Sequence, residues 1–156
     1  KEAMDRLKNA RVAVFGIGGV GGYVCEALVR TGVGAFDLID DDKVCLTNLN
    51  RQIIATRKTV GKYKTEVMKE RMLEINPDVK VEIHDCFFLP ENAKDFPFEE
   101  YDYIVVDSDE DGTLAAFCGY AAIIAEKETY DEDELNNRVI QLEDKECNVL
   151  GVIIRE

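Results

Sequence analysis

The 156-residue chain lacks tryptophan, has one histidine and three prolines, and is short of positive charge. Its 32 acidic residues outnumber 19 basic ones, and the formal charge of −13 argues against a broad nucleic-acid-binding face. The chain has no apolar run approaching the roughly 20 residues of a membrane span, and we expect no secretion signal, because its opening is polar. The single histidine, His84, has no evident catalytic partner, so we expect it to be structural.

Cysteine is present but lacks the spacing of a metal or redox motif. The five cysteines are far apart and form no CxxC pair, so zinc-binding and thioredoxin-like sites are not indicated. We expect reduced cysteines that pack as small apolar side chains, and therefore a cytoplasmic protein. Cys118 and Cys147 could act as thiols that trap an activated substrate, but packing is the favoured interpretation.

Short apolar runs alternate with helix-like segments through most of the chain. The runs predict buried strands at residues 10–16 and 101–107 and a further strand at 35–40, and an alternation of apolar and polar residues predicts a strand at 79–85. Helical sequence follows the first strand as far as Gly32, and a second helix is expected within residues 59–76, before Pro77. This alternation predicts an α/β fold with a Rossmann-like, mostly parallel sheet and flanking helices.

The last third of the sequence is atypical. Residues 113–128 suggest a helix weakened by Gly119, and residues 129–137 an acidic loop or helix start. Residues 138–156 suggest two strands around a turn. We nevertheless expect residues 1–156 to form one domain, because the length is that of a single domain.

A glycine cluster follows the first predicted strand in the stretch VAVFGIGGVGGYV. Gly16, Gly18, Gly19 and Gly21 form a G-x-G-G-x-G pattern between strand and helix, which is typical of loops that hold nucleotide phosphates. Asp40 ends the second predicted strand at a spacing suited to bonding ribose hydroxyls. These residues alone fit NAD and ATP equally well.

The stretch DDDKVCLTNLNRQ, residues 40–52, favours ATP. Arg51 can bond a triphosphate and stabilise charge on departing pyrophosphate, and Lys64 could add a second cation. Asn48 and Gln52 lie four residues apart and would share a helical face. Without such a site, Arg51 would be expected in a surface ion pair, and Lys64 as a solvated lysine.

The glycine loop, the NLNRQ element and the following helix together resemble the ThiF-like adenylyltransferases, relatives of the ubiquitin-activating enzymes. Within them, the chain is most similar to the tRNA threonylcarbamoyladenosine dehydratases. The resemblance covers residues 1–107 and leaves 108–156 unmatched. It implies that the glycine loop wraps the phosphates, that Asp40 holds the ribose and that Asp42 lies beside the nucleotide. The triphosphate contacts it implies are Asn48, Arg51, Gln52 and Lys64.

The resemblance also implies magnesium and a reaction. The expected Mg²⁺ ligand is Asp109, or Asp107 or Asp111 after a small shift, since magnesium prefers oxygen ligands and bridges phosphates. A substrate carboxylate attacks the α-phosphate of ATP, and pyrophosphate leaves. In the dehydratases, the activated threonylcarbamoyl carboxylate is closed into a ring by its own nitrogen. In the sulfur-carrier and ubiquitin branches, a thiolate or persulfide traps the adenylate instead.

Several readings of function stay open at this stage. The first is a dehydratase that acts on tRNA as a homodimer, and the alternative is an adenylyltransferase for a ubiquitin-like or sulfur-carrier protein with a sulfur-transfer partner. The unmatched last third would also fit a nucleotide-binding module without catalysis. An NAD-dependent oxidoreductase is the remaining hypothesis, and the NLNRQ element argues against it.

Overall fold

The computed structural model describes residues 1–107, 114, 118–126 and 131–155. The chain divides into two compact units, Lys1–Ser108 and Asp109–Glu156, and the boundary lies where the resemblance noted above ends. Unit 1 contains α1 (Glu2–Asn9), β1 (Arg11–Phe15), α2 (Gly21–Thr31), β2 (Ala35–Ile39), η1 (Leu46–Asn50), α3 (Lys64–Ile75), β3 (Lys80–His84), η2 (Pro90–Asp95), η3 (Phe98–Glu100) and β4 (Tyr103–Val106).

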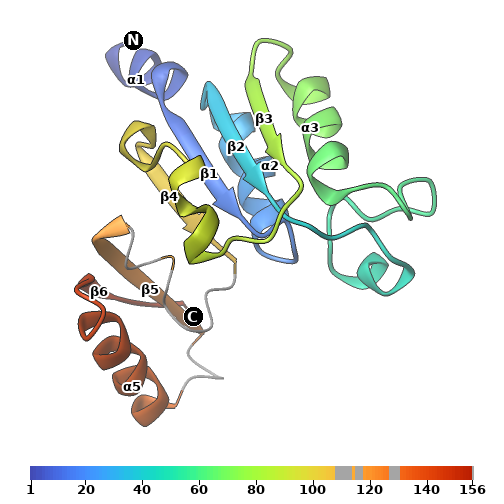
Figure 1. The fold of residues 1–156 in the computed structure, drawn as a ribbon. Helices are drawn as coiled ribbons and strands as arrows, with labels where there is room; N and C mark the ends of the chain where they lie inside the picture. The colour runs from blue at the N-terminus through green and yellow to red at the C-terminus, as the bar shows by residue number, and fades with distance from the viewer. Residues whose placement is uncertain (108–113, 115–117, 127–130, 156) are drawn as a thin grey trace. The chain divides into compact units, whose positions relative to one another are not determined.

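The sheet of unit 1 has four parallel strands in the order β3-β2-β1-β4 (Figure 1). In the register of the central strands, Val14 of β1 pairs with Leu38 of β2 and with Val105 of β4. Helices α2 and α3 connect β1 to β2 and β2 to β3, as parallel strands require. The expected Rossmann-like α/β fold and its four strands are confirmed. The burial expected for the fourth strand is wrong: in the described part of the chain β4 lies at the edge of the sheet, pairs with β1 alone and has no fully buried residue.

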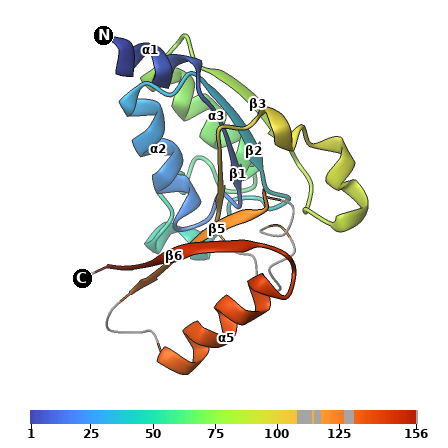
Figure 2. The ribbon, with the colours of Figure 1, turned by 90° about the vertical axis from the view of Figure 1, so that its left-hand side faces the viewer.

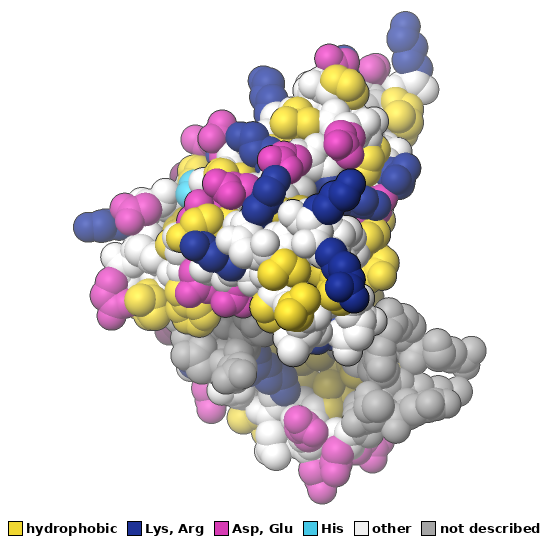
Figure 3. All heavy atoms as spheres, turned by 90° about the vertical axis from the view of Figure 1, so that its right-hand side faces the viewer, with side chains coloured by type: hydrophobic (Ala, Val, Ile, Leu, Met, Phe, Trp, Pro, Cys, Tyr) yellow, Lys and Arg dark blue, Asp and Glu magenta, His cyan; other side chains and the backbone are white. Residues whose placement is uncertain are grey.

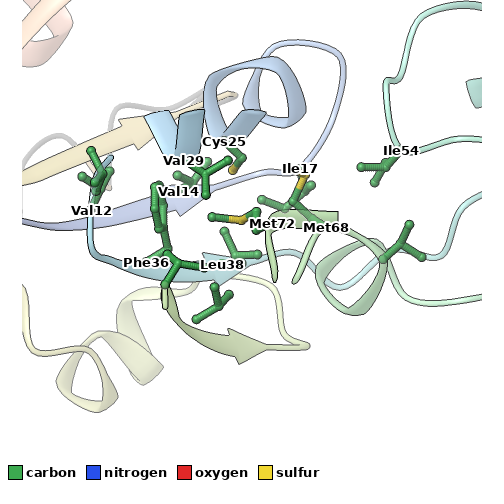
Figure 4. Packing of buried hydrophobic residues seen from close by; sticks show 14 of the residues in the cluster. Val12, Val14, Ile17, Cys25, Val29, Phe36, Leu38, Ile54, Met68 and Met72 are labelled. Atoms are coloured by element: carbon green, nitrogen blue, oxygen red, sulfur yellow. The ribbon is translucent and has the colours of Figure 1, made fainter. Parts of the chain in front are cut away.

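The main core lies between the sheet and the helices α2 and α3 (Figure 4). Val14 and Leu38 point from the strands into this layer, where they meet Cys25 of α2 and Met68 and Met72 of α3. All five side chains are fully buried, and burial of each large apolar one contributes roughly 1.5–3 kcal/mol. Alternation along each strand sends every second residue to this face and the others to the opposite one.

The opposite face of the sheet carries aromatic rings. Phe15 of β1 contacts Phe88, Phe96 and Phe98, which come from the segment that includes η2 and η3. The ring of His84 also packs against Phe96, with a centroid separation of 5.2 Å. This segment folds as two short 3₁₀ turns that cover part of this face.

A buried ion pair joins three strands on the same face. Asp37 of β2 has a side chain only 2% exposed, and its two oxygens accept hydrogen bonds from Nε and Nη2 of Arg11 at 2.8 and 3.1 Å. Nε2 of His84 lies 3.1 Å from Oδ1 of the same carboxylate. His84 therefore contributes to the structure of the sheet, in line with the role expected for it.

Unit 2 contains β5 (Tyr120–Glu126), α5 (Glu132–Glu143) and β6 (Asn148–Arg155). The two strands pair in parallel, and α5 lies beside β6 (Figure 2). The helix expected across residues 113–128 is wrong over β5, because a short run of alanine and isoleucine suits a strand as well as a helix. The first of the two strands expected in 138–156 is also wrong, and the second is β6.

Helix α5 replaces that strand because of its start signal. Asp131 caps the helix: its side chain accepts hydrogen bonds from the amides of Asp133 and Glu134. Three acidic residues in the first turn also complement the positive end of the helix dipole. A helix that begins this well continues through residues 138–143, where Leu142 is buried.

In the part of the chain that the structure describes, no helix has both the length and the apolar character needed to span a membrane.

Candidate nucleotide site

The glycine loop connects β1 to α2 in a conformation that only glycine fits well. Gly16 adopts a φ of +90°, a left-handed conformation that glycine accepts without strain. A Cβ added to Gly21 would come within 3.0 Å of the carbonyl oxygen of Gly16, closer than real Cβ atoms approach. The loop therefore folds tightly back on itself and leads directly into α2, which begins at Gly21.

Asp107, directly after β4, lies against this loop. Its Oδ2 accepts a hydrogen bond from the amide of Gly18 at 3.1 Å. A Cβ on Gly16 would lie 2.9 Å from Cβ of Asp107, and a Cβ on Gly18 would collide with its carboxylate. Gly16 and Gly18 are thus required by the approach of Asp107, which lies 89 residues after Gly18, and local sequence does not predict such a distant contact.

The expected Mg²⁺ ligand, Asp109, lies outside the described residues, as does Asp111. Of the three candidates, the structure therefore describes only Asp107. Among the described residues, no group of three or more histidine, cysteine or acidic side chains could hold a metal ion.

Asp40 follows β2 and is bound by backbone amides. Its Oδ2 accepts a hydrogen bond from the amide of Ile17 at 2.6 Å, and Oδ1 accepts one from the amide of Asp42 at 2.8 Å. The carboxylate therefore fixes the glycine loop relative to the end of β2, an anchoring role that the sequence analysis missed.

Lys64 is the first residue of α3 and is buried, with 7% of its side chain exposed. Its Nζ lies 2.7 Å from Oδ2 of Asp42 and 3.5 Å from Oδ1 of Asp40. The side chain of Asp42 is 68% exposed, so the pair opens to solvent on one side. Lys64 is thus not a solvated surface lysine. It is a buried cation held beside Asp40, the residue that fixes the glycine loop.

The η1 turn is closed by a reciprocal cap between Cys45 and Asn48. The backbone amide of Cys45 donates to Oδ1 of the buried Asn48 at 3.0 Å. In return, Sγ of Cys45 accepts a hydrogen bond from the backbone amide of Asn48. A hydrogen bond with Thr47 lowers the pKa of the Cys45 thiol, and the charge of Lys64 acts in the same direction. The signal for this cap is the polar Asn48 three positions after Cys45, a spacing that was not interpreted as a cap from the sequence.

Gln52 lies two residues after η1, and its backbone amide donates to the backbone carbonyl of Asn48 at 2.9 Å. The residue is 7% exposed, and its Oε1 has no hydrogen-bond partner within the described parts of the chain. A buried amide oxygen without a partner costs free energy, roughly 1–3 kcal/mol, so this position is suited to receive a donor from a ligand.

Arg51 is exposed and lies over the glycine loop. A Cβ on Gly19 would be 4.0 Å from Cγ of Arg51, and one on Gly22 would be 3.4 Å from the side chain of Ile53. Nη1 of Arg51 donates to the carbonyl of Thr47 at 3.0 Å and to Oδ1 of Asn50 at 3.1 Å. The guanidinium forms no ion pair with any described residue, so the surface-ion-pair reading does not hold for it.

The structure therefore brings most of the expected site residues to one end of the sheet, where parallel strands present their carboxyl ends. Glycine-loop amides, two cations and buried amide side chains meet there, and such a set suits a phosphate-bearing ligand. The two candidate trapping cysteines belong to unit 2: Cys147 is buried, and Cys118 is partly buried, with its Sγ donating to the carbonyl of Leu114.

Known proteins resemble this chain in sequence. The sequence model of the ThiF family matches residues 1–127. The tRNA threonylcarbamoyladenosine dehydratase of Haemophilus influenzae is 47% identical over 119 residues, which are 76% of this chain and 46% of that protein. The probable adenylyltransferase/sulfurtransferase MoeZ of Mycobacterium tuberculosis is 35% identical over 126 residues, 81% of this chain and 32% of that protein.

The fold of this chain is also found in solved structures. The crystal structure of the E. coli dehydratase TcdA in complex with ATP aligns with a TM-score of 0.73 and 44% identity, covering 76% of this chain and 50% of that one. The chain spans about half the length of the dehydratases it matches. Because the family match covers well over half of its residues, the chain belongs to the ThiF family.

Proposed function

We propose that this chain is the ATP-binding part of an enzyme that adenylates a carboxylate, and that its substrate is the threonylcarbamoyl group of tRNA threonylcarbamoyladenosine. The observation that carries the proposal is the packing of the NLNRQ segment against the glycine loop, with Arg51 over Gly19. An NAD-dependent oxidoreductase has no need of an arginine there. The proposed substrate comes from the dehydratases of H. influenzae and E. coli, which are 44–47% identical to this chain.

In this proposal the glycine loop and Arg51 bind the phosphates. Nη1 of Arg51 is occupied by Thr47 and Asn50, while Nε and Nη2 form no hydrogen bond with a described residue. These two donors are the edge of the guanidinium that can bond phosphate oxygens in fork geometry. Lys64 adds positive charge, and the buried Oε1 of Gln52 accepts a hydrogen bond from an amine or hydroxyl group of the nucleotide, since it cannot bond the triphosphate oxygens, which are acceptors themselves.

Magnesium fits this proposal as a metal shared with the phosphates. Mg²⁺ is commonly held by only one or two carboxylates together with substrate phosphate oxygens, so a dedicated protein cluster is not required. Asp107 offers a carboxylate beside the glycine loop, and Asp109 remains the ligand proposed by resemblance. When bound, the ion would neutralise charge on the phosphates.

Calorimetry with ATP and NAD tests the nucleotide, and ATP–pyrophosphate exchange with threonylcarbamoyladenosine-containing tRNA tests the chemistry. We expect ATP to bind more tightly than NAD. We also expect Arg51→Ala to lower exchange by at least about 100-fold while the circular dichroism spectrum stays unchanged, since preorganised charge on a developing anion is worth that much. Arg6→Ala, which removes an exposed arginine outside the site, is the matched control.

Tighter binding of NAD, or normal exchange by Arg51→Ala, would refute the assignment. Exchange that depends on a sulfur-carrier protein instead of tRNA would favour the adenylyltransferase branch, to which MoeZ belongs by its name. ATP binding without any exchange would support a nucleotide-binding module. The expected homodimer is a further proposal, tested by sedimentation of the purified chain.

A further inference from the structure

The segment between β2 and α3 forms a closed excursion, defined here as residues 43–63 (Figure 1). Lys43 and Tyr63 form an antiparallel bridge at its base. Next to the bridge, the amide of Val44 donates to the carbonyl of Lys62 at 2.9 Å, and the amide of Gly61 donates to the carbonyl of Val44 at 2.8 Å. These contacts hold the two ends of the excursion together.

The excursion has an unusual charge. It contains five basic residues and no aspartate or glutamate, so its formal charge is +5. Because the whole chain has a charge of −13, the remaining residues carry −18. One short segment of a strongly acidic chain thus carries a net positive charge. The net charge of the whole chain does not show this segment.

The basic side chains of the excursion are available to a partner. All five are exposed; they are Lys43, Arg51, Arg57, Lys58 and Lys62. Only Lys62 forms an ion pair with a described residue, a 3.4 Å contact to Glu70, while Lys43 lies over the ring of Tyr63. Figure 3 looks onto this side of unit 1, where several Lys and Arg side chains reach the surface.

A tight turn presents two of these cations together. Thr56 and Thr59 hydrogen-bond to each other through backbone and hydroxyl groups, and Arg57 and Lys58 occupy the positions between them. The backbone amide of Lys62 donates to the carbonyl of Thr59 at 3.1 Å, and this hydrogen bond keeps Lys62 close to the turn. The threonine hydroxyls are used within the turn, where Oγ1 of Thr59 also donates to the carbonyl of Ile54 at 2.9 Å, so the turn offers a phosphate the two adjacent cations.

We propose that the excursion is a docking surface for the phosphate backbone of an RNA. The proposal rests on the function given above, because Arg51 belongs to both the excursion and the proposed ATP site, so RNA bound here would lie next to the place where its carboxylate is activated. Lys43, Arg57, Lys58 and Lys62 supply the cations for the backbone. Specificity for a base would come from residues elsewhere.

The charge distribution favours RNA over an anionic membrane. A flat bilayer would bring negative charge close to a wide area of the protein, including the acidic residues around the excursion. An RNA helix is narrow, and at physiological salt a charge acts over a Debye length of about 8 Å. RNA can therefore contact the excursion while the rest of the acidic surface is screened.

The test compares two double charge reversals in the whole chain. Arg57→Glu/Lys58→Glu removes the pair at the tip of the turn, and Lys80→Glu/Lys94→Glu changes two exposed lysines elsewhere by the same net charge. Binding to a fluorescein-labelled tRNA transcript is followed by anisotropy between 50 and 200 mM salt, concentrations at which backbone contacts are sensitive. Binding of ATP is measured by calorimetry for each variant.

We expect the first variant to bind tRNA at least about tenfold more weakly, and the slope of log K against log salt to fall by about 1.5–2, because two phosphate contacts are lost. The control should keep most of its affinity and the wild-type slope. Equal loss in both variants, or no loss in either, would overturn the proposal. So would binding to phosphatidylserine vesicles that exceeds binding to tRNA.

The ATP measurement separates this proposal from the function on which it rests. Both variants should bind ATP as the unchanged chain does, because none of the four substituted residues belongs to the proposed nucleotide site. If the unchanged chain binds ATP but the tip variant keeps full tRNA affinity, only the docking surface fails. If the unchanged chain binds no ATP, the proposed function fails, and the docking surface fails with it.

Discussion

At the scale of single residues, Gly21 shows how closely the loop and the helix approach. Replacing it with alanine would force a methyl group against the carbonyl of Gly16, so we expect Gly21→Ala to lower the free energy of unfolding by about 3 kcal/mol. Gly19→Ala is the matched control, since its methyl group would meet only Cγ of Arg51, at 4.0 Å. Urea denaturation measures both. Equal stability of the two variants would contradict the close approach.

Asp37 is the residue whose loss should cost most on the other face of the sheet. Asp37→Ala would leave the guanidinium of Arg11 without its buried carboxylate, and we expect a destabilisation of about 3 kcal/mol. Burial of the phenol raises the pKa of nearby Tyr101, and the charge of Asp37 adds to this effect. Glu2→Ala, which breaks an exposed pair with Arg6, should change stability by less than about 0.5 kcal/mol in the same denaturation experiment.

At the scale of elements, α2 and α3 are joined by a salt bridge that responds to pH. Arg71 of α3 holds the pKa of Glu26 in α2 below its usual value, burial opposes this shift, and Arg30 adds to it. Because the folded pKa is lower than the unfolded one, the stabilisation is fully present above the ordinary glutamate pKa of about 4.3 and is lost as pH falls through the folded value.

Substitution of Glu26 tests this linkage. Glu26→Gln should be destabilised relative to the unchanged chain at pH 7, and the difference should shrink as pH falls below about 4. The measurement is urea denaturation at several pH values. Glu70→Gln is a suitable control, since its pair with Lys62 is exposed at both ends. A difference that grows towards low pH would contradict the direction of the shift.

Elements also show what the sequence could predict. The strands of unit 1 were predictable because short apolar runs end at glycine or acidic residues, and α3 ends before Pro77, as expected. The half-exposed position of β4 was not predictable, because it depends on the order of strands in the sheet. The strand β5 was not, because its alanine and isoleucine run lacks a period that separates strand from helix. The start of α5 was weighed as a loop or a helix, although the cap at Asp131 would have decided for a helix.

At the scale of the whole molecule, the site residues that the structure describes all belong to unit 1. We therefore expect ATP to slow hydrogen exchange of the amides in residues 16–22 and 44–52, and to leave residues 131–155 of unit 2 unchanged. Mass spectrometry of exchanged peptides measures this, with AMP as a comparison ligand. Protection by ATP confined to unit 2 would place the nucleotide elsewhere.

The residues of the candidate site were proposed from the sequence, but their contacts were not. The motifs drew attention to Gly16, Asp40 and Arg51, and the structure places each of them in or beside the glycine loop. Spacing does not reveal which distant groups converge, such as Asp107 on Gly18 or Asp42 on Lys64. Those contacts depend on the order of strands in the sheet, which places the ends of β2 and β4 on either side of β1.

The hydrogen bond between Asp107 and the Gly18 amide means that one amide of the loop already binds a carboxylate. One amide hydrogen makes one strong hydrogen bond, so Gly18 cannot donate to this carboxylate and to a phosphate at the same time. Binding of a nucleotide there would be an exchange of acceptors, and the gain would be the difference between two hydrogen bonds. The carboxylate released in that exchange would become free to bind a metal ion at the moment when the phosphates arrive.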